Sequence, residues 1–138
     1  MDSDNVSWKR IETITKLLAR KIKSTKKEFN SISTITRGGL VPARLIADIL
    51  DINEILVDKK KIPSDSLFVD DIYDSGDTFK KILSKVEKPS DLVYATLFAR
   101  KGKQYPRQLI YAMKTKGNEY IVYPWDKFEH RRMQKFEK

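Results

Sequence analysis

The feature that most constrains the fold of this chain is residues 67–78, where an apolar run leads directly into an acidic, glycine-containing turn. Residues 67–69 are apolar without interruption, which is typical of a central strand that is buried on both faces. Asp70 and Asp71 follow, and Ser75-Gly76 precedes apolar residues at helical spacing, namely Phe79, Ile82, Leu83 and Val86. We therefore expect a strand, an acidic turn and a helix in this order.

An earlier part of the chain has the same order. Residues 31–35 are short and β-branched, which predicts a strand, and residues 36–39 (Thr-Arg-Gly-Gly) interrupt the pattern. Pro42 stands near the first turn of a predicted helix, whose apolar face carries Leu45, Ile46, Ile49 and Leu50. Strands that alternate with helices predict a parallel sheet with right-handed crossovers.

The remaining segments complete a single α/β domain over residues 1–138. Apolar residues at spacings of three and four predict a helix over residues 7–23, with Ser7 as its N-cap. Residues 59–66 are polar and contain Pro63, so we expect a loop there. Further strands are expected over residues 54–57, 92–99, 109–112 and 120–123. The predicted fold is a parallel sheet flanked by helices.

Composition excludes several classes of protein. The chain of 138 residues has no cysteine and one histidine, His130, so a disulfide scaffold, a Cys-ligated metal and a Ser-His-Asp triad are not expected. The formal charge of +9 favours an anionic partner. Nucleic acid is not expected, because no aromatic residues interleave with the lysines of residues 16–27. No apolar run is long enough for a membrane span, and we expect a soluble, cytoplasmic protein without a membrane partner.

Two loops of the predicted sheet carry the chemistry, because ligands of open α/β sheets bind beyond the carboxyl ends of the strands. The first loop is residues 36–39 and the second is residues 70–78. In the second loop, Ser75, Gly76 and Thr78 offer hydroxyls and backbone N–H groups to a phosphate at a helix start. This is not a P-loop, since the lysine-containing GxxxxGK[ST] pattern is absent.

The acids of the second loop have separate predicted roles. Asp70 and Asp71 leave a buried strand and suit either the vicinal hydroxyls of a sugar or a divalent metal. Asp74 stands between them and the phosphate cradle, where a carboxylate can accept or return a proton. The alternative, that an Asp- and Gly-rich segment is merely a turn, does not explain why all these features occur together.

The second loop resembles the phosphoribosyl-diphosphate (PRPP) signature of the type I phosphoribosyltransferases. Three further segments resemble the 6-oxopurine branch of that family, the xanthine-guanine and hypoxanthine-guanine phosphoribosyltransferases. Residues 36–42 look like its pyrophosphate loop, residues 96–100 like the strand end that recognises the purine 6-position, and residues 120–126 like a C-terminal hood that stacks on the base. In this resemblance the N-terminus and about residues 113–130 supply the hood.

The resemblance implies Mg²⁺-dependent transfer of 5-phosphoribose from PRPP to a purine, with release of pyrophosphate, in purine salvage. It also implies a homo-oligomer, either a dimer or a tetramer. The implied residues are Asp74 and Arg37 for catalysis; Arg37, Gly38, Gly39, Asp70, Asp71, Asp74, Ser75, Gly76, Asp77 and Thr78 for PRPP; Asp70 and Asp71 for the metal; and Arg100, Tyr120, Ile121 and Val122 for the base.

The sequence departs from the family pattern at three places. Residues 51–66 are short where relatives have a long mobile loop, Arg100 replaces a purine-contacting lysine, and Val122 replaces an acid that reads the purine 2-substituent. Arg100 is therefore open to two interpretations, a purine contact or a solvated charge at a strand end. Two other functions also stay open, a PRPP- or nucleotide-binding regulatory protein with weak or no transfer, and a phosphoribosyltransferase for another base.

Overall fold

The computed structural model describes residues 2–126. Five parallel strands form the main sheet in the order β3-β2-β4-β5-β6. His130 and the part of the expected hood beyond Asp126 lie outside the described residues. The strands of this sheet are β2 (Ser31–Thr34), β3 (Ile55–Val57), β4 (Ser66–Tyr73), β5 (Val93–Ala99) and β6 (Leu109–Lys114).

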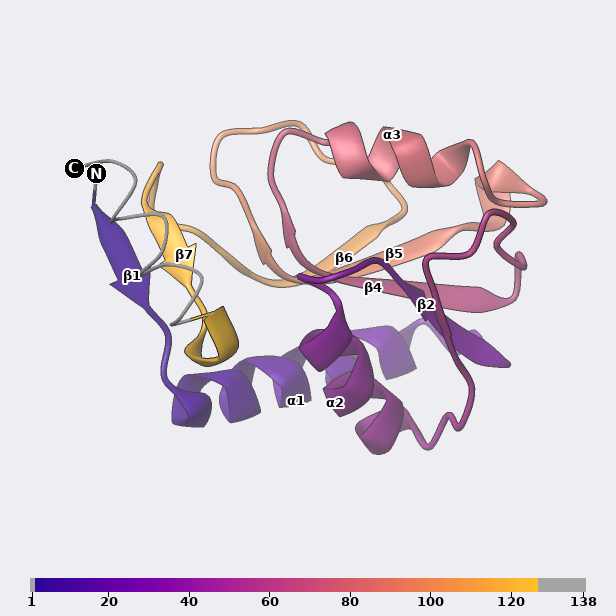
Figure 1. Ribbon diagram of the computed structural model, residues 1–138, viewed down its shortest axis with the longest axis horizontal. Helices are drawn as coiled ribbons and strands as arrows, with labels where there is room; N and C mark the ends of the chain where they lie inside the picture. The colour runs from indigo at the N-terminus through magenta and orange to yellow at the C-terminus, as the bar shows by residue number, and fades with distance from the viewer. Residues whose placement is uncertain (1, 127–138) are drawn as a thin grey trace.

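Helices cover the two faces of the sheet unequally, as Figure 1 shows. The helices α1 (Trp8–Ser24) and α2 (Leu40–Leu50) lie on one face, and the short α3 (Asp77–Leu83) lies on the other. Two short 3₁₀ turns, Pro89–Asp91 and Pro124–Asp126, complete the elements. The structure confirms the predicted α/β class.

The helix predicted over residues 7–23 is confirmed as α1, one residue later at each end. Ser7 is its N-cap, and the Ser7 hydroxyl accepts a hydrogen bond of 3.1 Å from the Arg10 N–H. The apolar stripe of α1 packs into the larger hydrophobic cluster of the protein. That cluster fills the space between the sheet and the two helices α1 and α2.

The predicted strand at residues 67–69 is longer in the structure, because β4 runs on through both acids to Tyr73. Its register with β5 extends to the pair Tyr73–Ala99, so main-chain pairing continues past the apolar run. Successive side chains of a strand alternate between the faces of the sheet, yet the carboxyl groups of Asp70 and Asp71 still interact, and both residues line the cavity before α3. The expected acidic turn is therefore the end of a strand.

The helix α3 is shorter than its apolar pattern predicts. It ends at Leu83, and Val86 instead forms an isolated parallel bridge with Ile62. The Ile62 N–H donates to the Lys85 carbonyl at 2.8 Å, which ties the β3–β4 connection to the end of α3. Val86 is buried by this bridge and by a second apolar cluster, rather than by a further helical turn.

A second sheet, which the sequence did not predict as such, joins the two ends of the described chain. The strand β1 (Ser3–Asn5) pairs in parallel with β7 (Tyr120–Val122). In Figure 1 this sheet stands beyond the carboxyl ends of β4 and β5. The ring of Trp125 lies 5.7 Å from that of Trp8, which anchors the segment after β7 to α1.

None of the helices in residues 2–126 is both long enough and apolar enough to cross a membrane.

Candidate active site

The candidate site lies at the carboxyl edge of the main sheet, on the side that faces the β1–β7 sheet (Figure 1). The first loop connects β2 to α2, and the second loop connects β4 to α3. Parallel neighbouring strands bring their carboxyl ends to one edge, so the pairing of β2 with β4 places these two loops together.

Asp70 is held rigidly on the face of the sheet that α3 covers. Its side chain is buried, with 6% of the residue exposed. One carboxylate oxygen accepts from the Tyr94 hydroxyl at 2.9 Å, and the other accepts from the Asp71 N–H at 2.8 Å. The Tyr94 ring is itself fixed by stacking on Phe68 at a centroid distance of 5.1 Å. Asp70 thus has no freedom to turn away from the edge.

Asp71 lies beside Asp70 and faces the first loop. Its Oδ1 accepts from the Ile72 N–H at 2.8 Å. A Cβ built on Gly38 would lie 2.9 Å from Asp71 Oδ2, so the first loop touches this carboxylate. The Tyr123 hydroxyl, which comes from the segment after β7, donates to the Asp71 carbonyl at 3.1 Å. The Asp71 side chain thus joins the first loop to the second, and its carbonyl joins both to the β7 segment.

Burial sets the electrostatics of this acid pair. Burial raises the pKa of Asp70, although its hydrogen bonds from Asp71 and Tyr94 act in the opposite direction. Burial, together with repulsion from Asp70, raises the pKa of Asp71 well above its ordinary value. Two adjacent carboxylates, one buried and one partly buried, are an environment that a cation or a hydroxyl-bearing ligand stabilises.

Close packing explains both glycines of the first loop. Gly38 leaves room for Asp71, as described above. Gly39 is tighter, because a Cβ there would stand 2.0 Å from Thr34 Oγ1 and 2.9 Å from the Val69 carbonyl oxygen. The Thr34 hydroxyl is already committed to that same carbonyl at 2.7 Å. The Thr36–Arg37 peptide bond of this loop is cis.

We expect Gly39→Ala to lower the free energy of unfolding by about 1–3 kcal/mol, the usual cost of forcing a methyl group into a packed site. The backbone φ of −86° at Gly39 suits alanine, so the clash alone causes the loss. Urea denaturation measures it. Gly117→Ala is the matched control, because its nearest neighbour would be 3.8 Å away. Equal stability of the two variants would contradict the clash.

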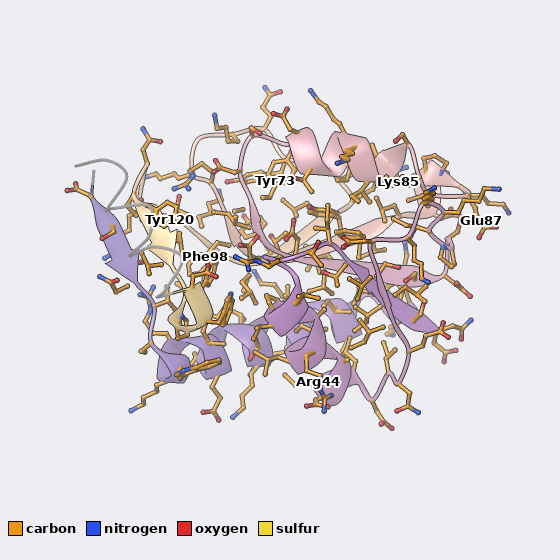
Figure 2. The ribbon with its side chains drawn as sticks, in the orientation of Figure 1. Arg44, Tyr73, Lys85, Glu87, Phe98 and Tyr120 are labelled. Atoms are coloured by element: carbon orange, nitrogen blue, oxygen red, sulfur yellow. The ribbon has the colours of Figure 1, made fainter. Side chains whose placement is uncertain are left out.

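The second loop forms a small cradle before α3. A cavity of about 140 Å³ is lined by residues 70–79 and Tyr94, and so includes Ser75, Gly76, Asp77 and Thr78. Gly76 has a φ of +91°, which favours glycine, and a Cβ there would meet the Tyr73 hydroxyl at 2.6 Å. Figure 2 shows Tyr73 between α3 and the sheet. The Ser75 hydroxyl accepts from the Asp77 N–H at 3.3 Å.

Arg100 is buried, with 9% of the residue exposed, so the interpretation as a solvated charge is wrong. Its Nε donates to Asp74 Oδ1 at 3.1 Å, and its Nη2 lies 3.4 Å from Asp74 Oδ2. Its Nη1 donates to the carbonyls of Gly117 and Glu119, at 3.0 and 2.7 Å. Arg100 therefore joins the second loop to the segment that precedes β7.

The three expected base-binding residues of β7 differ in exposure. Tyr120 is half-buried, and Figure 2 shows it on the β1–β7 sheet. Ile121 is buried in the larger hydrophobic cluster. Val122 is 4% exposed, and its carbonyl accepts from the Val6 N–H at 2.9 Å. Of the three, Tyr120 has the most accessible side chain.

Three residues that hold parts of the site in place were not predicted from the sequence. Tyr94 holds Asp70, and Tyr123 holds the main chain of Asp71. Asp58 holds the first loop, since its two carboxylate oxygens accept from the Thr36 N–H at 2.9 Å and from the Thr36 hydroxyl at 2.6 Å. Asp58 directly follows a predicted strand, and an acid in that position was a usable signal. Tyr94 has no such signal in the sequence, because its contact with Asp70 depends on the register between β4 and β5.

Comparison with known proteins agrees with this geometry. No protein-family model matches the chain. The xanthine-guanine phosphoribosyltransferase of Desulfotalea psychrophila is 29% identical over 142 residues, which cover 88% of this chain and 84% of the relative. The structure of a purine phosphoribosyltransferase from Pyrococcus horikoshii superposes with a TM-score of 0.70 at 25% identity, over 91% of this chain and 94% of its own.

A xanthine-guanine-hypoxanthine phosphoribosyltransferase from Helicobacter pylori shares the fold, with a TM-score of 0.74 at 15% identity over 95% of this chain and 99% of its own. The parallel sheet and the loops at its carboxyl edge define an α/β protein with the type I phosphoribosyltransferase fold. Within that class, the similarity to curated xanthine-guanine phosphoribosyltransferases and to a solved purine phosphoribosyltransferase supports a type I phosphoribosyltransferase related to the 6-oxopurine enzymes. The predicted resemblance is confirmed.

Proposed function

We propose that the protein is an Mg²⁺-dependent phosphoribosyltransferase that joins the 5-phosphoribosyl group of PRPP to a 6-oxopurine and releases pyrophosphate. The observation that carries this proposal is the position of the buried Asp70 and the partly buried Asp71, which lie between the glycines of the first loop and the cradle of the second loop. Curated relatives named xanthine-guanine phosphoribosyltransferase support the same chemistry.

PRPP has three charged or polar parts, the 5-phosphate, the ribose hydroxyls and the diphosphate, and each part suits a different portion of this site. The 5-phosphate suits the cradle of residues 74–78, where backbone N–H groups and the hydroxyls of Ser75 and Thr78 surround a small cavity. The ribose hydroxyls suit Asp70 and Asp71 as hydrogen-bond acceptors. The diphosphate suits the first loop, where Arg37 and the amides of Gly38 and Gly39 supply positive charge and donors.

The acid pair also fits a magnesium ion. Mg²⁺ is commonly bound by one or two carboxylates together with substrate phosphates. No group of three or more potential metal ligands occurs among residues 2–126, so the remaining ligands would come from substrate and water. Asp71 is the better metal ligand, because both carboxylate oxygens of Asp70 already accept hydrogen bonds. When bound, Mg²⁺ would neutralise part of the charge on the departing pyrophosphate.

The reaction breaks the bond between the anomeric carbon and the pyrophosphate oxygen, and a purine nitrogen forms the new bond. The sugar gains positive charge in the transition state, so positioning and electrostatics matter more than a nucleophilic side chain. The Asp74 carboxylate is 57% exposed beside the cradle, and we assign it to accept the proton that the purine loses.

The β7 segment is the proposed base site. Tyr120 would stack on the purine, Ile121 would offer main-chain contacts, and Val122 provides no side-chain hydrogen bond for a purine 2-substituent. We therefore propose that hypoxanthine and guanine are accepted and that xanthine is less favoured. A homo-oligomer, in which a second copy covers the site, belongs to the same proposal.

A second function, PRPP or nucleotide binding with weak or no transfer, is favoured by one observation. Residues 58–65 connect β3 to β4 with no helix or strand of their own, apart from the Ile62 bridge. A short connection leaves the reacting atoms open to water, which favours hydrolysis of PRPP over transfer.

The deciding experiment mixes the protein with PRPP, Mg²⁺ and one base at a time, choosing guanine, hypoxanthine, xanthine, adenine, uracil and orotate. We expect one nucleoside monophosphate and one pyrophosphate per turnover with a 6-oxopurine. Chelation by EDTA should abolish product, and added Mg²⁺ should restore it. Persistence of PRPP with every base, or its hydrolysis without nucleotide, would overturn the transferase and favour the binding protein. Chromatography follows both products.

A further inference from the structure

A larger cavity, of about 350 Å³, adjoins the candidate active site at Thr36 of the first loop and lies between α3 and the carboxyl ends of β2 and β3. Its floor combines apolar residues, such as Ile35 and Leu56, with the hydroxyl-bearing Ser33, Thr34 and Thr36, and its rim carries Lys59, Lys81 and Lys85. Figure 2 shows Lys85 on the α3 side of the sheet, opposite Arg44.

The charge around this cavity is unbalanced. Asp58 is the only acid among its lining residues, against the three lysines. None of the ion pairs within residues 2–126 includes Lys59, Lys81 or Lys85. Like charges around a concave surface with apolar walls focus a positive potential and attract an anion.

Asp58 cannot serve as the counter-ion for all three lysines. Its two carboxylate oxygens already accept from the Thr36 N–H and hydroxyl, and these bonds lower the pKa of Asp58. Lys81 and Lys85 act on Asp58 only as more distant charges, whose effect on its pKa is smaller. The cavity therefore keeps an excess of positive charge.

We propose that this cavity binds a phosphate-bearing anion with two or more linked phosphates. Lysine ammonium groups bind phosphate as point charges on flexible side chains. Three lysine charges, reduced by the negative charge of Asp58, leave a net positive charge that suits the negative charge of a diphosphate. Ile35 and Leu56, the partly exposed apolar residues of the floor, offer surface to an organic part of the ligand, such as a nucleoside. An inorganic polyphosphate and a nucleoside diphosphate share the charged chemistry and differ only in their use of the floor.

Asp58 connects this second site to the first loop. A bound anion draws Lys81 and Lys85 to itself and repels the Asp58 carboxylate, which holds Thr36 at the start of the first loop. Occupancy is expected to weaken PRPP binding several-fold, by negative coupling between the two sites. This coupling rests on the proposed function, whereas anion binding at the cavity does not.

The test is a titration of the full chain with tripolyphosphate at fixed ionic strength, followed by amide resonances. We expect shifts at Leu56, Asp58 and Ile82, separate from any shifts at residues 70–78. The double variant Lys81→Gln/Lys85→Gln should raise the Kd that is fitted to the shifts at Leu56, Asp58 and Ile82 about tenfold. The Kd that is fitted to any shifts at residues 70–78 should stay unchanged. A parallel titration with ADP reports whether the floor contributes to affinity.

Lys80→Gln/Lys88→Gln is the matched control, because it also removes two positive charges in and just after α3, and neither residue lines the cavity. Thermal melts show that the variants remain folded. The second site would be overturned if the shifts are confined to residues 70–78 or if no binding is seen at all. It would also be overturned if the control variant weakens tripolyphosphate binding as much as the double variant does. Loss of transferase activity in the base assay would not affect this result, so failure of the proposed function is seen separately.

Discussion

Asp74→Asn is expected to lower kcat by about 10²–10³-fold, within the usual contribution of a general acid or base. The substitution keeps the size of the side chain and one oxygen that can accept from Arg100 Nε, now 3.1 Å from Asp74 Oδ1. It removes the second carboxylate oxygen and with it the role that we propose for Asp74, to take the purine proton. The backbone of the phosphate cradle is unchanged, so the KM for PRPP should stay within about threefold of its value.

Steady-state kinetics with PRPP varied at saturating purine measure this separation, and calorimetric binding of PRPP checks it without turnover. Asp91→Asn is the control, since it removes one acid from an exposed 3₁₀ turn outside the site. An unchanged kcat in the Asp74 variant would remove Asp74 from catalysis. A large rise in KM with constant kcat would instead make it a binding residue.

The sequence predicted most of the main sheet because local pattern and tertiary environment agree there. Residues 67–69 are an apolar run, residues 93–99 are apolar apart from Thr96, and both become central strands that are buried on both faces. The pattern failed for β1, whose three residues Ser-Asp-Asn have no strand propensity. This strand exists only because β7 offers it a partner. Pairing with a distant segment cannot be seen in a local window.

The candidate site shows the same division. Asp70, Asp71 and Gly76 were found because acids after a buried strand and a glycine before a helix leave a local signal. Tyr94 was missed, because its contact with Asp70 depends on the β4–β5 register. Arg100 was found as a residue, but its burial and its partners depend on a loop some 17 residues later. Contacts that bridge separate segments need the fold before they can be predicted.

Arg100 gives the second large expected effect. Its guanidinium bridges Asp74 and two main-chain carbonyls, so one side chain joins the cradle to the segment before β7, for which we propose base binding. Arg100→Met keeps much of the apolar stem and removes every donor. We expect the free energy of unfolding to fall by about 2–3 kcal/mol, since charge-assisted hydrogen bonds contribute about 1.5–3 kcal/mol and Asp74 can regain water. Chemical denaturation measures this loss.

The kinetic consequence separates two roles of Arg100. If it positions the segment before β7, Arg100→Met should raise the KM for the purine by about tenfold or more and change the KM for PRPP much less. Arg100→Lys should not restore stability, because one ammonium group on a flexible stem cannot reproduce the planar fork that spans both loops. Recovery of purine KM in the lysine variant, without recovery of stability, would indicate direct contact with the base. Full stability of Arg100→Met would contradict the bridge itself, since the Gly117 and Glu119 carbonyls would then not depend on it.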